Sequence, residues 1–272
     1  MKRALLLAIL VMAAVLVAPH CAPQSPYDLA QLDCNDARLA PGSTGTTGMT
    51  YWLGTDEQGR DLLSAIVHGL RVSVVVALTA TLLALTLGML VGLVAAWAGG
   101  RVDELLMRVV DLQLSFPAIL VALILLAVLG TGLEKIVVAL VAAQWAYYAR
   151  TTRSIALVER QKAYVTAARA LGLSGATIAV RHVLPNCLPA LLVVATAQVA
   201  HAVALEATLS FLGLGVPITE PTLGLLVANG YPHLLAGRYW ISVFPGVALV
   251  IALLALHATG EHLRRRLARE TP

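Results

Sequence analysis

Long stretches without a charged side chain divide this sequence. Five of them carry no Asp, Glu, Lys or Arg, and they cover residues 4–27, 72–100, 112–133, 182–205 and 239–260. An α-helix rises about 1.5 Å per residue, so about 20 apolar residues are enough to cross the hydrocarbon core of a bilayer. Each stretch is long enough, and the pattern predicts five membrane-spanning helices.

A sixth charge-free stretch, 136–149, is shorter. It extends to Val158 if the side chains of Arg150 and Arg153 reach the lipid headgroups. Aromatic residues at the membrane interface are typical of a spanning helix. Those near this end are Trp145, Tyr147 and Tyr148. We expect a sixth span here, and the alternative is a helix that lies in the interface.

The distribution of positive charge predicts the orientation. Six spans place both termini on one side, and 14 of the 19 Lys and Arg residues then share that side. The five on the other side are Arg38, Arg60, Arg71, Lys135 and Arg238. Because cytoplasmic loops are enriched in Lys and Arg, both termini are expected in the cytoplasm. Without the fourth span, the basic cluster 264–266 would lie outside.

The composition excludes an ordinary soluble domain. The chain is 59% hydrophobic and 12% charged, whereas a soluble domain has about 25% charged residues. The sequence therefore predicts an all-α integral membrane protein with six transmembrane helices. We divide it into an anchor helix with an extracytoplasmic segment (1–70), a transmembrane domain (71–260) and a basic cytoplasmic tail (261–272). The net charge of +4 is explained by anchoring at the membrane surface and requires no nucleic acid.

The N-terminal region has two interpretations. Lys2 and Arg3 precede an apolar core, as in a secretory signal, but no A-x-A cleavage site follows. We expect a retained anchor helix. Cys21 and Cys34 lie in the segment assigned to the extracytoplasmic side, where a disulfide is permitted and two free thiols are the alternative. Cys187 is expected to be a packing residue.

The chain has no motif for a source of energy. It contains no phosphate-binding loop, no H-E-x-x-H and no C-x-x-C. We therefore expect no metal site, no bound cofactor and no catalytic residue in this chain. The chain is therefore interpreted as a conduit through the membrane without its own energy source, and we expect a partner protein that supplies the energy.

The predicted fifth helix carries polar side chains at membrane depth. Gln198, His201 and Glu206 fall within about 140° of arc on this helix. These three residues are candidates for a water-filled translocation path, and the alternative is a polar face that holds helices together. His201 and Glu206 are five residues apart, which does not favour a catalytic pair on a membrane enzyme. A secondary transporter would show an inverted repeat or more intramembrane charge, and neither is visible.

The longest predicted cytoplasmic connection, 150–185, reads as two helices and a tight turn. Alanines and a leucine favour a helix over 164–171. Gly172 suits the left-handed position that closes this helix, and Ser174 is a good N-cap for the next one. Pro185 is expected to end the second helix.

The tip of this hairpin has small side chains. Ala167 and Ala168 allow another protein's backbone to approach closely, so the hairpin would fit a groove in a partner. The alternative is a linker helix that lies on the membrane.

The hairpin resembles the EAA loop of ABC importer permeases. The resemblance is to the peptide/nickel permease family, and in particular to its second, C-type permease, whose loop reads like Tyr-Val-x-Ala-Ala-Arg-x-x-Gly and then Arg-His-x-Leu-Pro-Asn. Residues 164–172 and 181–186 follow this pattern. Thr166 stands where the loop has its glutamate, which removes a charge from the contact with the ATPase.

Three further stretches resemble the same family and extend the resemblance over about residues 50–260. Residues 53–61 resemble its Gly-Thr-Asp-x-x-Gly-Arg-Asp element, although Asp and Gly there also suit a simple capped turn. Residues 206–215 resemble its Glu-Ala-x-Leu-Ser-Phe-Leu-Gly-Leu-Gly signature, where glycines and Pro217 end the fifth span. The start of the third span resembles the family at Asp103, Met107, Arg108, Asp111 and Pro117. Glu104 is also spaced to pair with Arg108.

The resemblance implies a type I ABC importer transmembrane domain in the cell inner membrane. Such a permease pairs with a second homologous permease, binds two ATP-binding subunits that hold the ATP, and receives substrate from a separate binding protein. By resemblance, the residues that couple to the ATPase are Thr166, Ala167, Ala168, Gly172, Arg181 and Pro185. Peptides are the expected substrates, with nickel or another small solute as the alternative.

Overall fold

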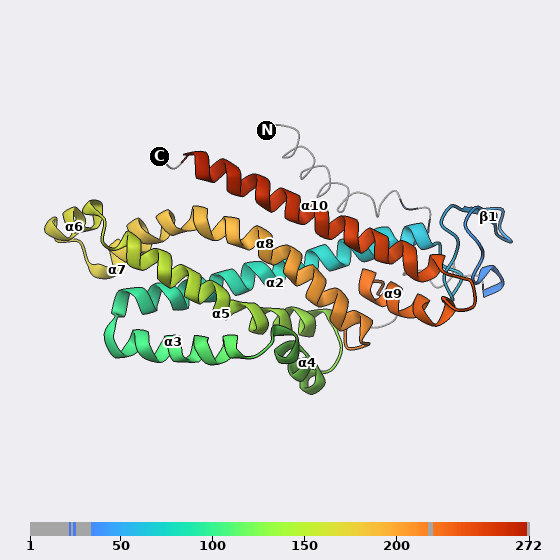
Figure 1. Ribbon diagram of the computed structural model, residues 1–272, viewed down its shortest axis with the longest axis horizontal. Coiled ribbons are helices and arrows are strands. Elements are labelled where there is room, and N and C mark those ends of the chain that lie inside the picture. Colours follow the sequence, from blue (N-terminus) through green and yellow to red (C-terminus); the bar gives the residue numbers. More distant parts are fainter. Residues whose placement is uncertain (1–21, 23, 26–33, 217–219, 271–272) are drawn as a thin grey trace.

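The chain is an elongated bundle of long helices (Figure 1). The structure is a computed structural model that describes residues 22, 24–25, 34–216 and 220–270. Helices α6 and α7 lie at one end of the bundle and strand β1 lies at the other (Figure 1). Apart from residues 22, 24 and 25, the predicted first span (4–27) falls outside the described residues, and so do Cys21, Pro217 and the side chain of Cys34.

Four long helices form the body of the bundle. They are α2 (Leu62–Ala98), α5 (Leu133–Glu159), α8 (Leu184–Phe211) and α10 (Trp240–Glu270). The shorter helices are α3 (Gly100–Ser115), α4 (Ala118–Leu129), α6 (Ala163–Ala170), α7 (Gly175–Ile178) and α9 (Leu223–Gly230). The remaining elements are η3 (Cys34–Asp36), η4 (Ala179–Val183), η5 (Tyr231–His233), β1 (Ser43–Thr44) and β2 (Thr50–Tyr51), the two strands being antiparallel.

Helix α2 begins earlier than the charge-free stretch indicates. The carboxylate of Asp61 accepts a hydrogen bond from the backbone N–H of Ser64 at 2.8 Å and so caps the first turn. The helix continues through the exposed Arg71 and ends before Gly99, whose φ is 64°. The predicted domain boundary at 70/71 therefore lies inside α2, and the one at 260/261 lies inside α10.

The predicted third span, 112–133, is wrong as a single helix. The chain leaves α3 at Phe116, which is extended (φ −92°, ψ 139°), and α4 starts after Pro117. The two helices meet at 89°. Proline lacks a backbone N–H and disfavours the helical conformation of the residue before it, so the break falls at this position.

Helices α2 and α5 pack with their backbones very close. Gly88 and Gly92 of α2 face α5 in a G-x-x-x-G arrangement. A Cβ added at Gly92 would lie 2.3 Å from the carbonyl oxygen of Ala149, and one at Gly88 would lie 2.5 Å from that of Trp145. Small residues that allow this approach are typical of helix pairs in membranes.

Among the described residues, three helices are long and apolar enough to cross a membrane. They are Leu62–Ala98, Gly175–Phe211 and Trp240–His262, and the bent pair α3–α4 would be a fourth. Residues 136–158, the predicted fourth span, do form a continuous helix within α5, but this helix is not among those three. The chain is a multi-pass membrane protein, whereas the predicted number of six spans is not confirmed.

Helix α8 continues directly from the hairpin, so the prediction that Pro185 ends a helix is wrong. A π-helical segment, η4, joins α7 to α8, and Pro185 lies in the first turn of α8. The wider turns of η4, in which the N–H of Leu184 donates to the carbonyl of Ala179 five residues earlier, precede this proline, which has no N–H to donate. At the other end, Gly213 has φ 77° after the last turn of α8, as predicted for a glycine that ends this helix.

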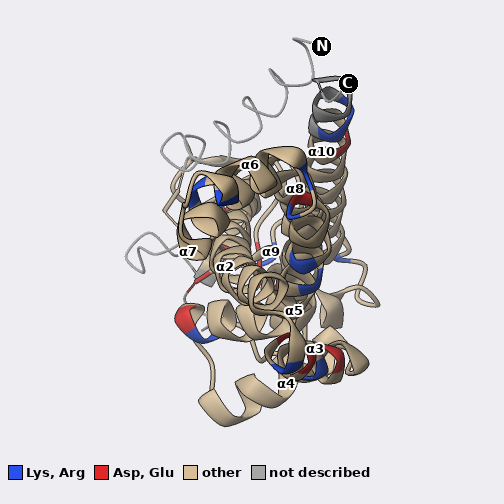
Figure 2. Cartoon of the chain, turned by 90° about the vertical axis from the view of Figure 1, so that its left-hand side faces the viewer, with Lys and Arg blue, Asp and Glu red and all other residues tan. Residues whose placement is uncertain are grey.

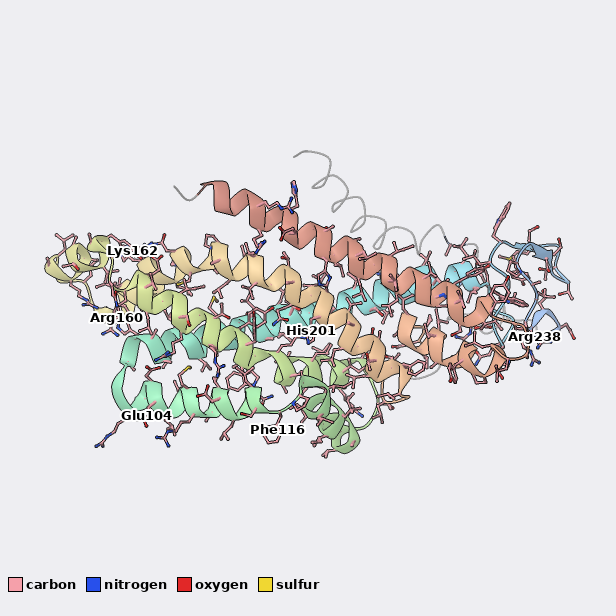
Figure 3. The ribbon with its side chains drawn as sticks, viewed as in Figure 1. Glu104, Phe116, Arg160, Lys162, His201 and Arg238 are labelled. Carbon is pink, nitrogen blue, oxygen red and sulfur yellow. The ribbon has the colours of Figure 1, made fainter. Side chains whose placement is uncertain are left out.

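Charged residues mark the two ends of the bundle. Arg160 and Lys162 lie at the end that carries α6, Arg238 lies at the opposite end, and His201 lies about halfway between them (Figure 3). Figure 2 looks onto the α6 end and shows several Lys and Arg positions, coloured blue, along the helices seen from that end. Arg160 and Lys162, which are predicted to be cytoplasmic, thus lie at the opposite end of the bundle from Arg238, which is predicted to be outside.

The segment before α2 is a small structure of its own. Asp56 accepts hydrogen bonds from the backbone N–H groups of Gln58 at 2.8 Å and Arg60 at 2.9 Å, which confirms the predicted turn. The carboxylate of Asp36 is buried and accepts from the backbone N–H of Thr46 at 2.9 Å and the hydroxyl of Tyr51 at 3.1 Å.

Candidate functional site

The hairpin at the end of the bundle consists of α6 and α7. Two residues that the sequence singles out, Gly172 and Ser174, form the turn between these helices. Gly172 has φ 77°, and its backbone N–H donates to the carbonyl of Arg169 at 2.9 Å. The hydroxyl of Ser174 accepts a hydrogen bond from the backbone N–H of Thr177 at 3.2 Å and caps α7. The predicted helix, turn and helix are confirmed, although the second helix is a single turn that continues through η4 into α8.

One side of the hairpin is open. Thr166, Ala167 and Gly172 are exposed, and the side chain of Leu171 at the tip is 81% exposed. Arg181 and Pro185 are exposed as well. The bundle therefore leaves an apolar side chain uncovered at the tip, beside residues with little bulk.

Ala168 does not belong to this open side. It is only 6% exposed and packs with Val165 against the bundle, because residues three apart share one face of α6. The expectation that both alanines face a partner is therefore corrected, and only Ala167 is available to one.

The inner face of the hairpin joins a continuous apolar cluster. Val165 and Ile178 are fully buried with Leu93 of α2 and Leu191 of α8 close by in the same cluster. Cys187 is buried there too, which confirms the predicted packing role. The hairpin is thus attached to α2 and α8 by buried apolar surface.

A polar group fixes the start of the hairpin. The carboxylate of Glu159, at the end of α5, accepts from the Nζ of Lys162 at 2.6 Å and from the hydroxyl of Tyr164 at 2.8 Å. Burial, together with the bond to Glu159, raises the pKa of Tyr164 to about 12. The hydroxyl therefore stays protonated at neutral pH and remains a donor.

Helix α3 is held to α5 by ion pairs. Arg153 donates to both oxygens of Asp103, at 2.5 and 2.6 Å, and Arg150 pairs with Asp111. These two arginines were expected to reach for headgroups, but the structure gives each an acidic partner on α3. The predicted pair of Glu104 with Arg108 is present within α3.

The three polar residues predicted to share one face of α8 lie in different environments. Glu206 is completely buried, and its carboxylate oxygens accept from the hydroxyls of Ser73 and Ser210, both at 2.7 Å. Gln198 is partly exposed and His201 is exposed. The structure therefore separates Glu206 from the other two candidates and links it to α2.

Gln198 lines a large hollow between three helices. This hollow has a volume of about 760 Å³ and is also lined by Tyr147 of α5 and His257 of α10. A second hollow of about 340 Å³ continues along α8, where Thr208 contributes to its lining. We call the two hollows, with the exposed His201 between them on α8, the α8 groove.

Comparison with known proteins agrees with this architecture. Residues 84–269 match the family described as binding-protein-dependent transport system inner membrane component. A putative peptide transport system permease protein of Brucella suis is 44% identical over 80% of this chain and 73% of its own length.

Two further relatives are similar over most of both chains. The di/tripeptide transport system permease protein DppC of Pseudomonas aeruginosa is 35% identical over 96% of this chain and 84% of its own. The nickel transport system permease protein NikC of Escherichia coli is 35% identical over 89% of this chain and 85% of its own. Among solved structures, a chain of the inward-facing MetNI methionine ABC transporter matches with a TM-score of 0.62 at 20% identity, over 76% of this chain and 97% of that one. That last similarity shows a shared fold.

Proposed function

The chain belongs to the family of binding-protein-dependent transport system inner membrane components, and we propose that it works as one of two paired permeases in an ATP-driven importer of di- or oligopeptides. Two ATP-binding subunits would bind at the α6 end and a substrate-binding protein at the opposite end. The α6 end and both termini would then be cytoplasmic. ATP is held and hydrolysed by the partner subunits, and this chain, a transport subunit, holds no cofactor of its own.

The observation that carries this proposal is the open, firmly attached hairpin. Its inner face is buried against α2 and α8, and its outer face presents Thr166, Ala167 and the exposed Leu171. A rigid projection with an apolar tip suits a groove on another protein, so a push on the tip would move the helices to which it is attached. Thr166 offers a hydroxyl at the position of the family's glutamate, so this position can supply a hydrogen bond but no charge.

The α8 groove is the part of the translocation path that we assign to this chain. Gln198 and His201 supply neutral and titratable polar groups at membrane depth, where polar side chains face a partner helix or water. Glu206 has no exposed surface, so we assign it to helix packing.

The names of the relatives support a proposed substrate. The relative at 44% identity and the DppC relative are named for peptides and di/tripeptides, which favours peptides. The NikC relative is named for nickel, which leaves nickel or another small solute as the second candidate for the same architecture. Uptake of radiolabelled dipeptides in competition with nickel separates the two.

Replacing Gly172 by valine tests the coupling. We expect the native chain, co-expressed with its partner permease and ATP-binding subunits, to retain the ATP-binding subunit on purification in detergent. The variant should lose most of it, because a β-branched residue at φ 77° costs about 1–2 kcal/mol per residue and reshapes the turn.

A matched control exists at the opposite end of the bundle. Gly237 also has φ 77° and also has no atom within 4 Å of an added Cβ. Gly237→Val therefore carries the same strain and should keep the ATP-binding subunit. Equal recovery with both variants would contradict coupling through the hairpin. No ATP-binding subunit with the native chain would instead indicate a transporter that needs none.

A further inference from the structure

Trp97 lies where the hairpin of α6 and α7 joins the rest of the bundle. It lies in the last turn of α2, is partly buried, and packs against the apolar cluster that holds α6 and α7. The guanidinium carbon of Arg160 lies 5.5 Å from the centroid of its ring, and that of Arg169 lies 5.7 Å from it. Both distances are within the range in which a cation is attracted to an aromatic face.

The two arginines come from different segments. Arg160 follows the last residue of α5, at the α6 end of the bundle (Figure 3). Arg169 lies in the last turn of α6, within the hairpin itself. The indole of Trp97 therefore joins the end of α2, the end of α5 and the outer part of α6.

Arg160 also binds the end of α2 directly. Its Nη1 donates to the carbonyl of Ala96 at 2.7 Å and to that of Trp97 at 3.3 Å. The last carbonyls of a helix have no partner within it, and a cation there is favoured by the helix dipole. This contact fixes the guanidinium of Arg160 beside the ring.

The first residue of α7, Gly175, also lies beside Trp97. A Cβ added at Gly175 would lie 2.8 Å from Nε1 of Trp97, so the backbone of α7 runs directly over the edge of the indole. Four segments, α2, α5, α6 and α7, thus meet at one side chain.

We propose that Trp97, Arg160 and Arg169 form a clamp that transmits movement of the hairpin to α2 and α5. This inference rests on the proposed function and deepens it, because it names the residues through which the ATP-binding subunits act on the helices. The apolar contacts of Val165 and Ile178 are non-directional, whereas cations stacked on one ring add a directional contact that fixes the orientation of α6 relative to both helices. The three are positioning residues, since they act through the hairpin.

The test separates the coupling of ATP hydrolysis to transport from the assembly of the transporter. The complete transporter, with its partner permease, ATP-binding subunits and binding protein, is reconstituted in proteoliposomes. Transport and ATP hydrolysis are measured together for Trp97→Leu and Trp97→Phe. We expect Trp97→Leu to keep the ATP-binding subunit and its basal hydrolysis but to lower substrate transported per ATP by about fivefold, because it removes two cation–π contacts. Trp97→Phe keeps an aromatic face and should recover most of the ratio.

The exposed member of the clamp provides a second variant. Arg169 lies on the surface of α6, so Arg169→Gln should fold normally, lower the same ratio and be rescued by Arg169→Lys, which keeps the charge. Arg108→Gln is the matched control, since the side chain of Arg108 is 72% exposed and pairs within its own helix.

The outcomes are distinguishable. A native transport-to-hydrolysis ratio in Trp97→Leu or in Arg169→Gln overturns the clamp while leaving the proposed function intact. If Trp97→Leu gives no folded protein, the ratio in Arg169→Gln decides. Failure of the native chain to recruit an ATP-binding subunit refutes the proposed function itself.

Discussion

Replacing Gly92 by alanine is expected to force α2 away from α5 and to lower the melting temperature of the purified chain. The added Cβ would lie 2.3 Å from the carbonyl oxygen of Ala149 and 2.8 Å from Cβ of Thr152. The first of these atoms belongs to the backbone of a helix and cannot rotate away. Overpacking of this kind costs about 1–3 kcal/mol, which corresponds to a fall of about 2–12 °C for a chain of this size.

The glycines of the bundle provide a graded series for this experiment. The nearest atom to an added Cβ is at 2.5 Å for Gly88, 3.2 Å for Gly69 and 3.9 Å for Gly246. Alanine at Gly246 should therefore be neutral or slightly stabilising, since it replaces a glycine in a helix at ordinary contact distance. Melting temperatures measured in one detergent should rise from Gly92→Ala and Gly88→Ala through Gly69→Ala to Gly246→Ala. A Gly92→Ala variant as stable as Gly246→Ala would show that the two helices do not pack at this distance.

Local signals in the sequence predict local structure well. The left-handed Gly172, the capping Ser174 and the pair of Glu104 with Arg108 each depend on residues a few positions apart, and the structure confirms all three. The charge-free stretches 72–100, 182–205 and 239–260 likewise lie almost entirely within helices, because the bilayer requires long apolar segments and satisfied backbone groups.

Predictions fail where a proline or a neighbour decides the outcome. Pro117 breaks the third stretch at 89°, although a proline inside a charge-free run is a visible sign of a break. Pro185 was expected to end a helix, but η4 before it absorbs the irregularity and the helix continues. Helix α5 is less apolar than α2, and its buried residues pack against α2, α3, α4 and α8.

Contacts between distant segments are not readable from one sequence. The separation of Glu206 from His201 depends on Ser73, which is 133 residues away from Glu206. The clamp at Trp97 brings together three segments that span more than 70 positions, and its only local sign is an aromatic residue at the end of an apolar run. Helical periodicity places residues on a face, but the neighbours of that face decide what each one does.

Replacing Glu206 by leucine should abolish stable protein, whereas Glu206→Gln should be tolerated. The carboxylate accepts from Ser73 of α2 and Ser210 of α8, which are 0% and 1% exposed, and Thr222, the N-cap of α9, also interacts with it. Leucine would leave at least two buried hydroxyls without a partner, and each such group costs about 1–3 kcal/mol. Glutamine keeps the size and can both accept from and donate to hydroxyls. The yield of monodisperse protein and its melting temperature measure the difference.

Transport by the Glu206→Gln variant then decides whether Glu206 acts in helix packing or in the translocation path. If Glu206 only holds α2, α8 and α9 together, a stable Glu206→Gln protein should transport at close to the native rate, while substitutions at Gln198 and His201 in the α8 groove should change transport without changing stability. A stable Glu206→Gln protein that does not transport would contradict the packing role, because a neutral residue of the same shape preserves the contacts to the serines. The charge of the carboxylate would then act in transport, and the three polar residues of α8 would again form one functional set.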